Sequence, residues 1–373
     1  MEVQFFNFSH DIALAHGEKV FTPPTVVRAM ERDLQGLRHL LPQSFAGYTA
    51  DAPVWGWDAA LVYSLTKAGY TNLPTAEQLA AMRSLSSRHT AVNVLSQLRN
   101  SLCGMPLIGE SRFLTTAEQL DTLFPVTPRH EATPIRPLPA PTYLIKEAYS
   151  SSGRGLRPAG DSLAPKTRQW ALRCIREQGG VEIEPYYTNK VLDFAMEFTA
   201  TTTEIRYDGL SVFLTRGNNT YAGNIVAPQA ILEDKIAAFI DRKTLQIVRN
   251  RLMELLFTTL QGQYLGPIGV DMMVVRQAAG FMLHPCVEIN LRRTMGNLAL
   301  YMLPLLPSGK TAVFSILYHK DPQALAAQIN QLQSTQSVIL LTAPSFLEGA
   351  LSPHHAAPLS HEASHSFAAL LTY

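Results

Sequence analysis

A run of prolines divides the chain and limits how it can fold. From Phe124 to Pro141 the 373-residue chain carries six prolines. Proline has no amide hydrogen to donate inside a helix or a central strand, so this stretch predicts a connector and not part of a core. A new folding unit is expected to begin directly after it.

The composition describes a folded chain without a strong charge. Hydrophobic residues make up 46% of it, and 31 Lys plus Arg against 30 Asp plus Glu leave a net charge of +1. At this length two or three domains are expected. A balanced charge offers no broad cationic face to a phosphate backbone, so nucleic acid is not an expected partner.

The cysteines and the apolar runs bear on the compartment. Three isolated cysteines form no CxxC pair, which fits a reducing environment. The first residues include Glu2, His10 and Asp11 and do not resemble a secretion signal. The longest apolar run, Leu298 to Leu306, is about half of the roughly 20 residues that span a bilayer. The sequence therefore predicts a cytoplasmic protein with no membrane partner.

The N-terminal region reads as a small α/β unit. A strand is predicted over Val3 to Phe6, and helices over Thr25 to Leu40 and around Asp58 to Lys67. Trp55 and Trp57 precede the second helix and are expected to pack in the core or at its rim.

The part of the chain after the prolines also reads as mixed α/β. Pro228 precedes one long helical pattern of apolar residues that extends to Leu256. The other predicted strands are Tyr143–Lys146, Val181–Glu184, Gly269–Val275, Met282–Asn290, Val313–Tyr318 and Ser337–Thr342, and the other predicted helices are Lys166–Glu177 and Pro322–Leu332. The fold class is therefore α/β in the mixed, α+β sense.

A strand lysine is followed by a glycine- and serine-rich turn. Lys146 precedes Ser150-Ser151-Ser152-Gly153-Arg154-Gly155. Glycines let backbone amides converge on one point, and the lysine and arginine add positive charge, which suits phosphate. An ordinary flexible hairpin is the alternative.

Two carboxylates and an amide lie on the predicted hairpin near the C-terminal end of the chain. Glu288 and Asn290 are two residues apart and share a face of their strand, and Asp271 on the preceding strand can lie opposite them. Val287 and Ile289 are expected on the other, buried face. A carboxylate pair is costly without a cation, so these three oxygen ligands predict a Mg²⁺ site. The alternative is that they are acidic residues at strand ends that face solvent.

Two arginines follow this hairpin directly. Arg292 and Arg293 could bind a phosphate or a substrate carboxylate. Alternatively, they only neutralise Glu288.

The segment Glu184-Pro185-Tyr186-Tyr187 leaves a strand. Pro185 cannot continue a ladder, so free backbone groups here could read an adenine edge, and Asp193 could accept ribose hydroxyls. A strand followed by a loop explains the same residues.

The order of these parts resembles the ATP-grasp superfamily over roughly residues 85 to 305. Within that resemblance, Ser86-Ser87-Arg88-His89 matches the entry segment, and Arg292 matches a reactive-centre arginine. The resemblance implies that Lys146 and Arg292 are catalytic and that Asp271, Glu288 and Asn290 bind metal. It assigns the nucleotide to Arg88, Lys146, Ser151, Ser152, Gly153, Arg154, Gly155, Glu184, Pro185, Tyr186, Tyr187 and Asp193.

The resemblance also implies an architecture: an ATP-grasp fold with a small N-terminal α/β domain. Residues 1–85 would form that domain, 86–195 the entry segment and lid subdomain, 196–310 the metal-binding subdomain, and 311–373 a C-terminal α/β extension and tail.

The implied activity is that of an ADP-forming ligase. It would join a small-molecule carboxylate to an amine or thiol through an acyl phosphate, with ATP and one or two Mg²⁺ ions, which Mn²⁺ can replace. The alternatives are an ATP-grasp kinase that phosphorylates a small molecule, and a non-catalytic nucleotide-binding protein.

Two groups of residues stay open at this point. His10 and Asp11 either line the substrate cleft or cap the first loop. His354, His355, His361 and His365 are expected to lie in a solvated tail.

Overall fold

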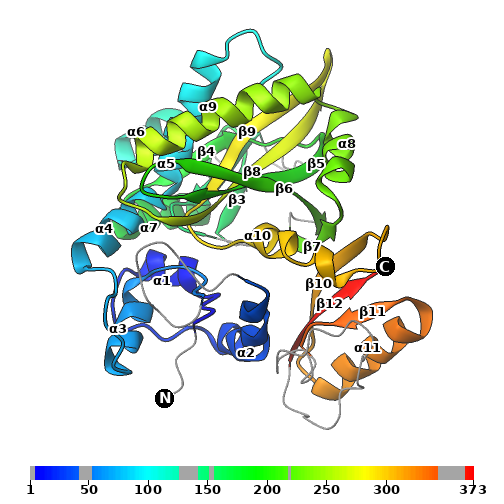
Figure 1. Cartoon of the computed structure of the whole chain (residues 1–373). Helices are drawn as coiled ribbons and strands as arrows, with labels where there is room; N and C mark the ends of the chain where they lie inside the picture. Colours follow the sequence, from blue (N-terminus) through cyan, green and yellow to red (C-terminus); the bar gives the residue numbers. More distant parts are fainter. Residues whose placement is uncertain (1–4, 42–52, 126–141, 151–154, 217–219, 343–365) are drawn as a thin grey trace, which may run out of the picture.

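Two antiparallel sheets organise the molecule (Figure 1). The computed structural model describes residues 5–41, 53–125, 142–150, 155–216, 220–342 and 366–373. The four-stranded sheet has the order β1-β4-β2-β3, and the eight-stranded sheet has the order β11-β12-β10-β7-β6-β5-β8-β9. The strands are β1 (Arg112–Leu114), β2 (Tyr143–Glu147), β3 (Leu156–Ala159), β4 (Val181–Pro185), β5 (Lys190–Ala200), β6 (Ile205–Arg216), β7 (Thr220–Val226), β8 (Gly266–Gln277), β9 (Gly280–Asn290), β10 (Ala312–Tyr318), β11 (Val338–Leu340) and β12 (Phe367–Thr372).

Helices surround both sheets, so the predicted mixed α/β fold class is confirmed. The helices are α1 (His10–His16), α2 (Thr25–Leu34), the 3-10 helix η1 (Gln35–Leu40), α3 (Ala59–Lys67), α4 (Ala76–Leu85), α5 (Arg88–Ser101), α6 (Ala117–Leu123), α7 (Pro165–Gln178), α8 (Gln229–Ala237), α9 (Arg242–Leu260), α10 (Met295–Leu300), the 3-10 helix η2 (Leu303–Leu305) and α11 (Pro322–Thr335). No helix in the described part of the chain is long and apolar enough to cross a membrane.

The small sheet separates a helix-covered face from a polar one. On β2, Ile145 packs with residues of α6 and α7, while Lys146 points to the other face because side chains alternate along a strand. On β4, Ile183 joins the same helices, and Glu182 lies directly opposite Lys146 in the register. Charged side chains thus gather on the face that looks toward the large sheet.

The large sheet repeats this division. Phe194 and Met196 on β5 pack in one core with residues of α9 such as Val248 and Leu252. The alternate residues of β5, Asp193 among them, face the opposite side, where the small sheet lies. The predicted domain boundaries remain predictions; the eight-stranded sheet continues across residues 195 and 310.

The single helix predicted after Pro228 is two helices in the structure, so this prediction was wrong. The chain breaks between α8 and α9, because the carboxylate of Asp241 accepts a hydrogen bond from the backbone amide of Thr244 at 2.9 Å and caps α9. The apolar residues of the pattern are still buried: Leu232, Ile236, Ile240, Val248, Leu252, Leu255 and Leu256 all join the main core.

The predicted strand at Val3 to Phe6 is also wrong within its described part. Phe5 and Phe6 lie in a bend. The side-chain amide of Gln35 accepts from the backbone amide of Phe6 and donates to its carbonyl, both at 3.2 Å, and so takes the place of a neighbouring strand.

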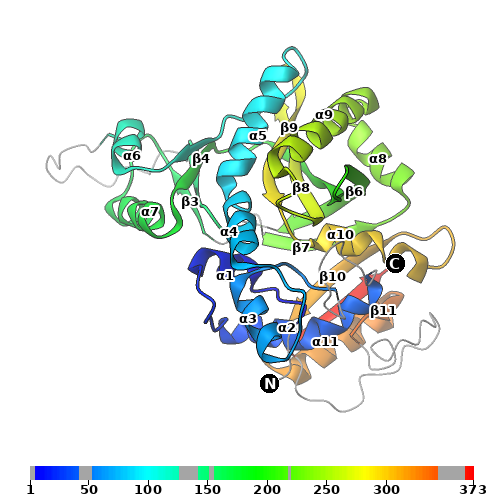
Figure 2. The same ribbon diagram turned by 60° about the vertical axis from the view of Figure 1, so that its left-hand side comes forward.

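The two ends of the described chain lie together. Figures 1 and 2 place α2 near the C-terminal strands, and Asp33 at the end of α2 accepts hydrogen bonds from the backbone amides of Ser366 and Phe367 at 2.7 and 3.1 Å. Strand β12 lies between β10 and β11, with Leu371 in the core shared with the N-terminal region and Leu370 against α11. The last residues are therefore part of a sheet interior, while the four histidines predicted in the tail lie outside the described residues.

The position of β12 predicts that the C-terminus is needed for stability. Leu371→Ala should lower the free energy of unfolding by about 2–5 kcal/mol, because it opens a cavity between the sheet and the N-terminal helices. Phe257→Ser, at an α9 side chain that is 48% exposed, is the control and should change it by less than about 0.5 kcal/mol. Urea unfolding measures both, and an equally small effect of Leu371→Ala would contradict the placement of β12.

Candidate functional site

A cavity of about 550 Å³ lies between the two sheets. Its volume falls in the range typical of small-molecule sites. Of the predicted site residues, those that line it are Arg88, Lys146, Glu184, Tyr186, Tyr187, Asp193, Asp271, Glu288, Asn290 and Arg292. The fold therefore brings together residues that are up to about 200 positions apart in the sequence.

Lys146 lies on β2 of the small sheet and is only 3% exposed. Its Nζ lies 2.8 Å from Glu184 Oε1 and 3.5 Å from Glu182 Oε2. Within the described residues, Nζ has no partner in hydrogen-bond geometry, and the same is true of Oε2 in both glutamates. Buried polar atoms without hydrogen bonds are costly, so this cluster fits a site that takes a polar ligand.

Arg88 connects the two sheets. It begins α5, which Ser87 caps, and its guanidinium lies 3.5 Å from Glu182 on the small sheet and 2.9 Å from Glu288 on the large one. The nearby carboxylates raise the pKa of Arg88 even though burial lowers it. Arg88 also donates to the hydroxyl of Ser150 at 3.3 Å. Ser150 precedes Ser151 to Gly155, the glycine-rich turn that is the predicted lid over the phosphates.

The lid itself is only partly described. Ser151, Ser152, Gly153 and Arg154 lie outside the described residues. Gly155 follows in a left-handed conformation with φ of 69°, and a Cβ there would lie 2.9 Å from the carboxyl carbon of Glu147. The turn between β2 and β3 therefore requires glycine at this position.

The segment from Glu184 to Tyr187, which was predicted to contact adenine, differs from the expectation in one respect. The backbone amide of Tyr186 was expected to be free for an adenine edge, but it donates to the carbonyl of Thr142 at 2.9 Å, because Pro185 is still paired with β2. Tyr187 packs edge-on against His284 with ring centroids 5.7 Å apart. Both tyrosines line the cavity.

Asp193 lies on β5 and also lines the cavity. Its carboxylate is 2.7 Å from Lys190 Nζ and accepts from the Thr215 hydroxyl at 3.0 Å. Both partners are donors, so the carboxylate keeps a defined direction.

Asp271, Glu288 and Asn290 lie side by side on β8 and β9. Asp271 and Glu288 are directly paired in the register, and the Asn290 amide is 3.4 Å from Asp271 Oδ2. Burial, followed by the charge of Glu288, raises the pKa of Asp271 to about 7. The described residues contain no cluster of three or more His, Cys, Asp or Glu that could hold a metal, so a cation here would have two carboxylates and one amide oxygen. That donor set fits Mg²⁺.

The packing around these three residues corrects two expectations. Val287 lines the cavity and is not buried on the far face, because the register shifts between Asp271 and Met273. Glu288 was expected to be neutralised by a bound cation or by Arg292 and Arg293, but Arg88 lies 2.9 Å from it. Pro285 lies in this shifted stretch of β9, which is an edge strand, where a missing amide is tolerated.

The two arginines after β9 have different surroundings. Arg292 lines the cavity and pairs with Asp11, with NH2 to Oδ2 at 2.9 Å. Arg293 is buried away from it and donates to the Val54 carbonyl at 3.3 Å and to Asn297 at 3.2 Å. Arg293 therefore ties the N-terminal region to the loop after β9.

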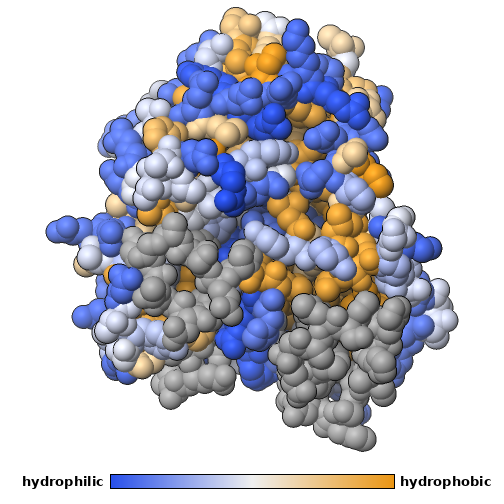
Figure 3. Space-filling view, viewed as in Figure 1, coloured by the Kyte–Doolittle hydropathy of each residue, from blue (hydrophilic) through white to orange (hydrophobic). Residues whose placement is uncertain are grey.

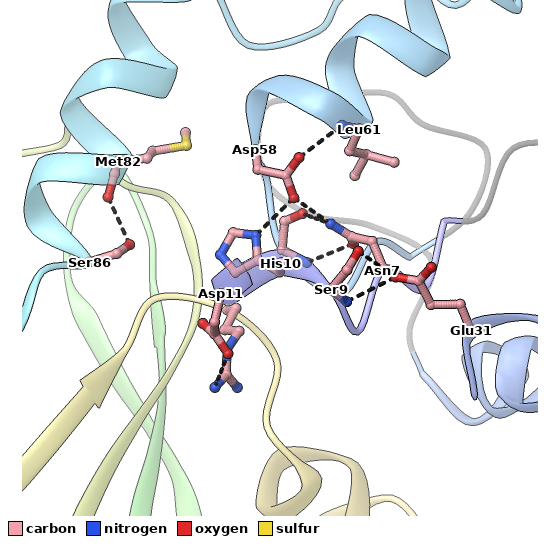
Figure 4. Close-up of polar contacts among 11 residues, drawn as sticks. Asn7, Ser9, His10, Asp11, Glu31, Asp58, Leu61, Met82 and Ser86 are labelled. Carbon is pink, nitrogen blue, oxygen red and sulfur yellow. Dashed lines mark hydrogen bonds and ion pairs between the residues drawn. The ribbon is translucent and has the colours of Figure 1, made fainter. Parts of the chain in front are cut away.

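A buried polar network joins the start of α1 to α2 and α3 (Figure 4). Asp58 accepts from Asn7 at 2.8 Å, lies 3.2 Å from Nδ1 of His10 and caps α3. Ser9 donates to Glu31 through both its amide and its hydroxyl. Asp11 lines the cavity with Arg292, whereas His10 belongs to the network and borders a small hollow beside Asn290. A role of either residue in a substrate cleft stays a prediction.

Glu197 is a cavity residue that was not predicted. It is fully buried on β5 and accepts from the hydroxyls of Ser211 at 2.9 Å and Thr294 at 3.0 Å. Burial raises its pKa to about 8. A Cβ at Gly296 would overlap Glu197 and Ser211, so glycine is required there. The signal in the sequence is the spacing of Asp193 and Glu197, which share a face of one strand.

Comparisons with known proteins gave matches among solved structures alone. No family model and no curated protein matches the chain. Among solved structures, it is similar to N5-carboxyaminoimidazole synthetase from Staphylococcus aureus complexed with ADP, at 14% identity over 83% of this chain and 72% of that one, with a TM-score of 0.44.

Two further solved structures are similar to a comparable extent. A biotin carboxylase complex from Campylobacter jejuni has 14% identity over 84% of this chain and 67% of that one, with a TM-score of 0.43. An L-amino acid ligase from Bacillus licheniformis has 13% identity over 86% and 76%, with a TM-score of 0.40. At such identities and TM-scores the likeness assigns no activity to the chain.

The burial of Glu197 predicts a pH dependence of stability. A carboxyl whose pKa rises on folding binds its proton more tightly in the folded state, so its contribution to stability declines as the pH rises from about 4.5 to about 8. Glu197→Gln should remove this decline, so the stability of the variant relative to the wild type should increase across that window.

Urea unfolding at several pH values between 4.5 and 9 measures the difference. Glu204→Gln, at an exposed glutamate, is the matched control and should show a difference that does not vary with pH. A constant difference for Glu197→Gln as well would show that Glu197 titrates normally.

Proposed function

We propose that the chain is an ATP-grasp enzyme that joins a small-molecule carboxylate to an amine or thiol and forms ADP and phosphate. The observation that carries the proposal is the single cavity between the sheets. Lys146 and Arg88 line it from one side, and Asp271, Glu288 and Asn290 line it from the other.

The nucleotide would lie with its base near Tyr186 and Tyr187, and its ribose near Asp193. Its phosphates would lie between Lys146 and the pair of Asp271 and Glu288. The Lys146 ammonium supports this placement, because its Nζ has no hydrogen-bond partner among the described residues and a phosphate oxygen can accept from it.

Asp271, Glu288 and Asn290 would hold Mg²⁺. When bound, the ion supplies positive charge against the phosphates and relieves the repulsion that raises the pKa of Asp271. The raised pKa of a carboxyl that faces a second carboxylate is the observation that favours a cation at this place.

The cationic side chains around the cavity are all paired with carboxylates. Lys146 is paired with Glu184, Arg88 with Glu288, and Arg292 with Asp11. These carboxylates compensate the buried positive charges while no ligand is bound. Phosphates would compete with them for the same cations.

The proposed reaction has two steps. A substrate carboxylate oxygen attacks the γ-phosphorus, the bond to ADP breaks, and an acyl phosphate forms. An amine or thiol then attacks the carbonyl carbon, phosphate leaves, and the nucleophile's proton is released. Arg292 lies beside the metal ligands and would stabilise the oxyanion of the second step.

ATP binding is the first property to test. At a hundredfold excess over its dissociation constant, Mg-ATP should stabilise the protein by about 2.7 kcal/mol. The double substitution Lys146→Met with Glu184→Gln removes the ion pair as a unit and should abolish most of this gain while the chain still folds.

Lys166→Met, at an exposed lysine on α7, is the control and should retain the full gain. Thermal unfolding with and without Mg-ATP measures all three proteins. An unchanged melting temperature of the wild type at saturating Mg-ATP would contradict the proposal.

The two carboxylates of the metal site should respond differently to substitution. Asp271→Asn and Glu288→Gln should both abolish the Mg²⁺-dependent part of the ATP-induced stabilisation, and lower ADP formation by orders of magnitude. Without ligand, Asp271→Asn should leave stability equal or higher, because it relieves repulsion.

Glu288→Gln should instead lower the ligand-free stability by about 1–3 kcal/mol, because Arg88 loses its closest carboxylate. Urea unfolding of both variants in the presence of a chelator measures this contrast. Retention of the Mg²⁺ effect in both variants would show that the metal binds elsewhere.

A further inference from the structure

The cavity extends well beyond the residues proposed to hold the nucleotide and the metal. It follows the face of the large sheet from β9, at one edge, to β12, which is the seventh strand counted from that edge. Its far end is lined by six apolar residues that none of the roles above uses: Phe8, Met30, Trp55, Ile316, Tyr318 and Phe367.

This apolar end is far from the metal residues. Asp271 lies on β8 and Ile316 on β10, which are four strand positions apart in the sheet. With neighbouring strands about 4.8 Å apart, the separation along the sheet is about 19 Å. A ligand that reaches both places is therefore elongated.

The apolar end has its own scaffold. Its residues come from the N-terminal region and from β10 and β12, and all but Tyr318 belong to or pack against the core shared by those two regions. Tyr318 and Phe367 contact each other with ring centroids 4.6 Å apart, and Tyr318 remains 44% exposed. Figure 3 shows apolar side chains gathered around α10 and β10 on this face.

Arg292 stands where the apolar wall meets the polar part of the cavity. Its guanidinium carbon lies 6.0 Å from the centroid of the Trp55 ring, which in turn lies 4.6 Å from that of Phe8. Asp11 accepts a hydrogen bond from Nε and lies 2.9 Å from NH2, and the Arg293 carbonyl accepts from NH1. A guanidinium has five N–H donors, and the hydrogen bonds among the described residues do not use all of them.

We propose that the carboxylate substrate is an acid with an elongated apolar body. Its carboxylate binds at Arg292, and its body extends along Trp55 and Phe8 toward Ile316 and Phe367. The inference rests on the proposed function and narrows its substrate to apolar monocarboxylic acids, as against amino, sugar or dicarboxylic acids. Each methylene that leaves water in this part of the cavity should improve affinity about fourfold.

Hydroxylamine allows the test to proceed without knowledge of the amine, because it converts an acyl phosphate to a hydroxamate. ADP and hydroxamate formation would be measured with acetate, butanoate, hexanoate and octanoate, and with suberate as the dicarboxylate of octanoate's length. The ratio kcat/KM should rise about fourfold per methylene, and octanoate should exceed suberate at least a hundredfold.

The double substitution Ile316→Thr with Tyr318→Ser alters the apolar end and keeps residues that suit a strand. It should lower the ratio of octanoate to acetate activity about tenfold. Phe257→Ser, on α9, is the matched surface control and should leave that ratio unchanged. A flat series, or a preference for acetate or suberate, would overturn the inference and leave the ligase proposal standing.

Binding of octanoate and suberate to the ATP-free protein is a second measurement that needs no turnover. Calorimetric titration should detect octanoate alone, with weaker binding to the double variant. If octanoate binds in this way but no acid yields ADP, the apolar site stands and the ligase proposal falls. If neither acid binds and no hydroxamate forms, both fall.

Discussion

The site depends on one buried guanidinium. Arg88 lies between Glu182 of the small sheet and Glu288 of the large sheet, at 3.5 and 2.9 Å, and is only 6% exposed. A buried charge is tolerated only when it is paired, so the two sheets must face each other for Arg88 to be compensated. Removing either carboxylate would leave a charge in the interior, which links the geometry of the cavity to the stability of the fold.

The same principle applies to the rest of the cavity. Lys146 depends on Glu184, Arg292 on Asp11, and Asp193 on Lys190 and Thr215. Asp271 is the exception, since burial and then the charge of the paired Glu288 raise its pKa. A cavity whose cations are already paired, and in which Asp271 faces a second carboxylate, is suited to receive an anion together with a cation.

The N-terminal and C-terminal regions complete the cavity. Asp33 binds the backbone at the start of β12, and Asp11 reaches Arg292 from α1. Residues of these two regions make up the apolar end, so the character of the far part of the cavity is determined outside the strands that carry the metal ligands. The proposed nucleotide and acceptor parts can therefore vary separately.

The sequence by itself determined the elements whose signal is local. Alternation placed Lys146 on one face of its strand and Glu288 with Asn290 on one face of theirs, and the spacing of apolar residues found the buried positions of α8 and α9. Most of the predicted site residues within the described chain line one cavity for this reason. Val287 and the amide of Tyr186 departed from expectation, because a register shift and a strand pairing altered their surroundings.

Only the tertiary structure decided which elements meet. The local pattern does not predict that β12 pairs with β10, or that Arg88 meets Glu288 across 200 residues. It also does not predict that the side chain of Gln35 takes the place of a neighbouring strand at Phe6. Glu197 shares a strand face with Asp193, but its raised pKa arises from burial by distant segments, which the strand pattern does not show. Alternation and capping act over a few residues, whereas desolvation and ion pairing depend on which surfaces come together, and only the folded chain fixes that.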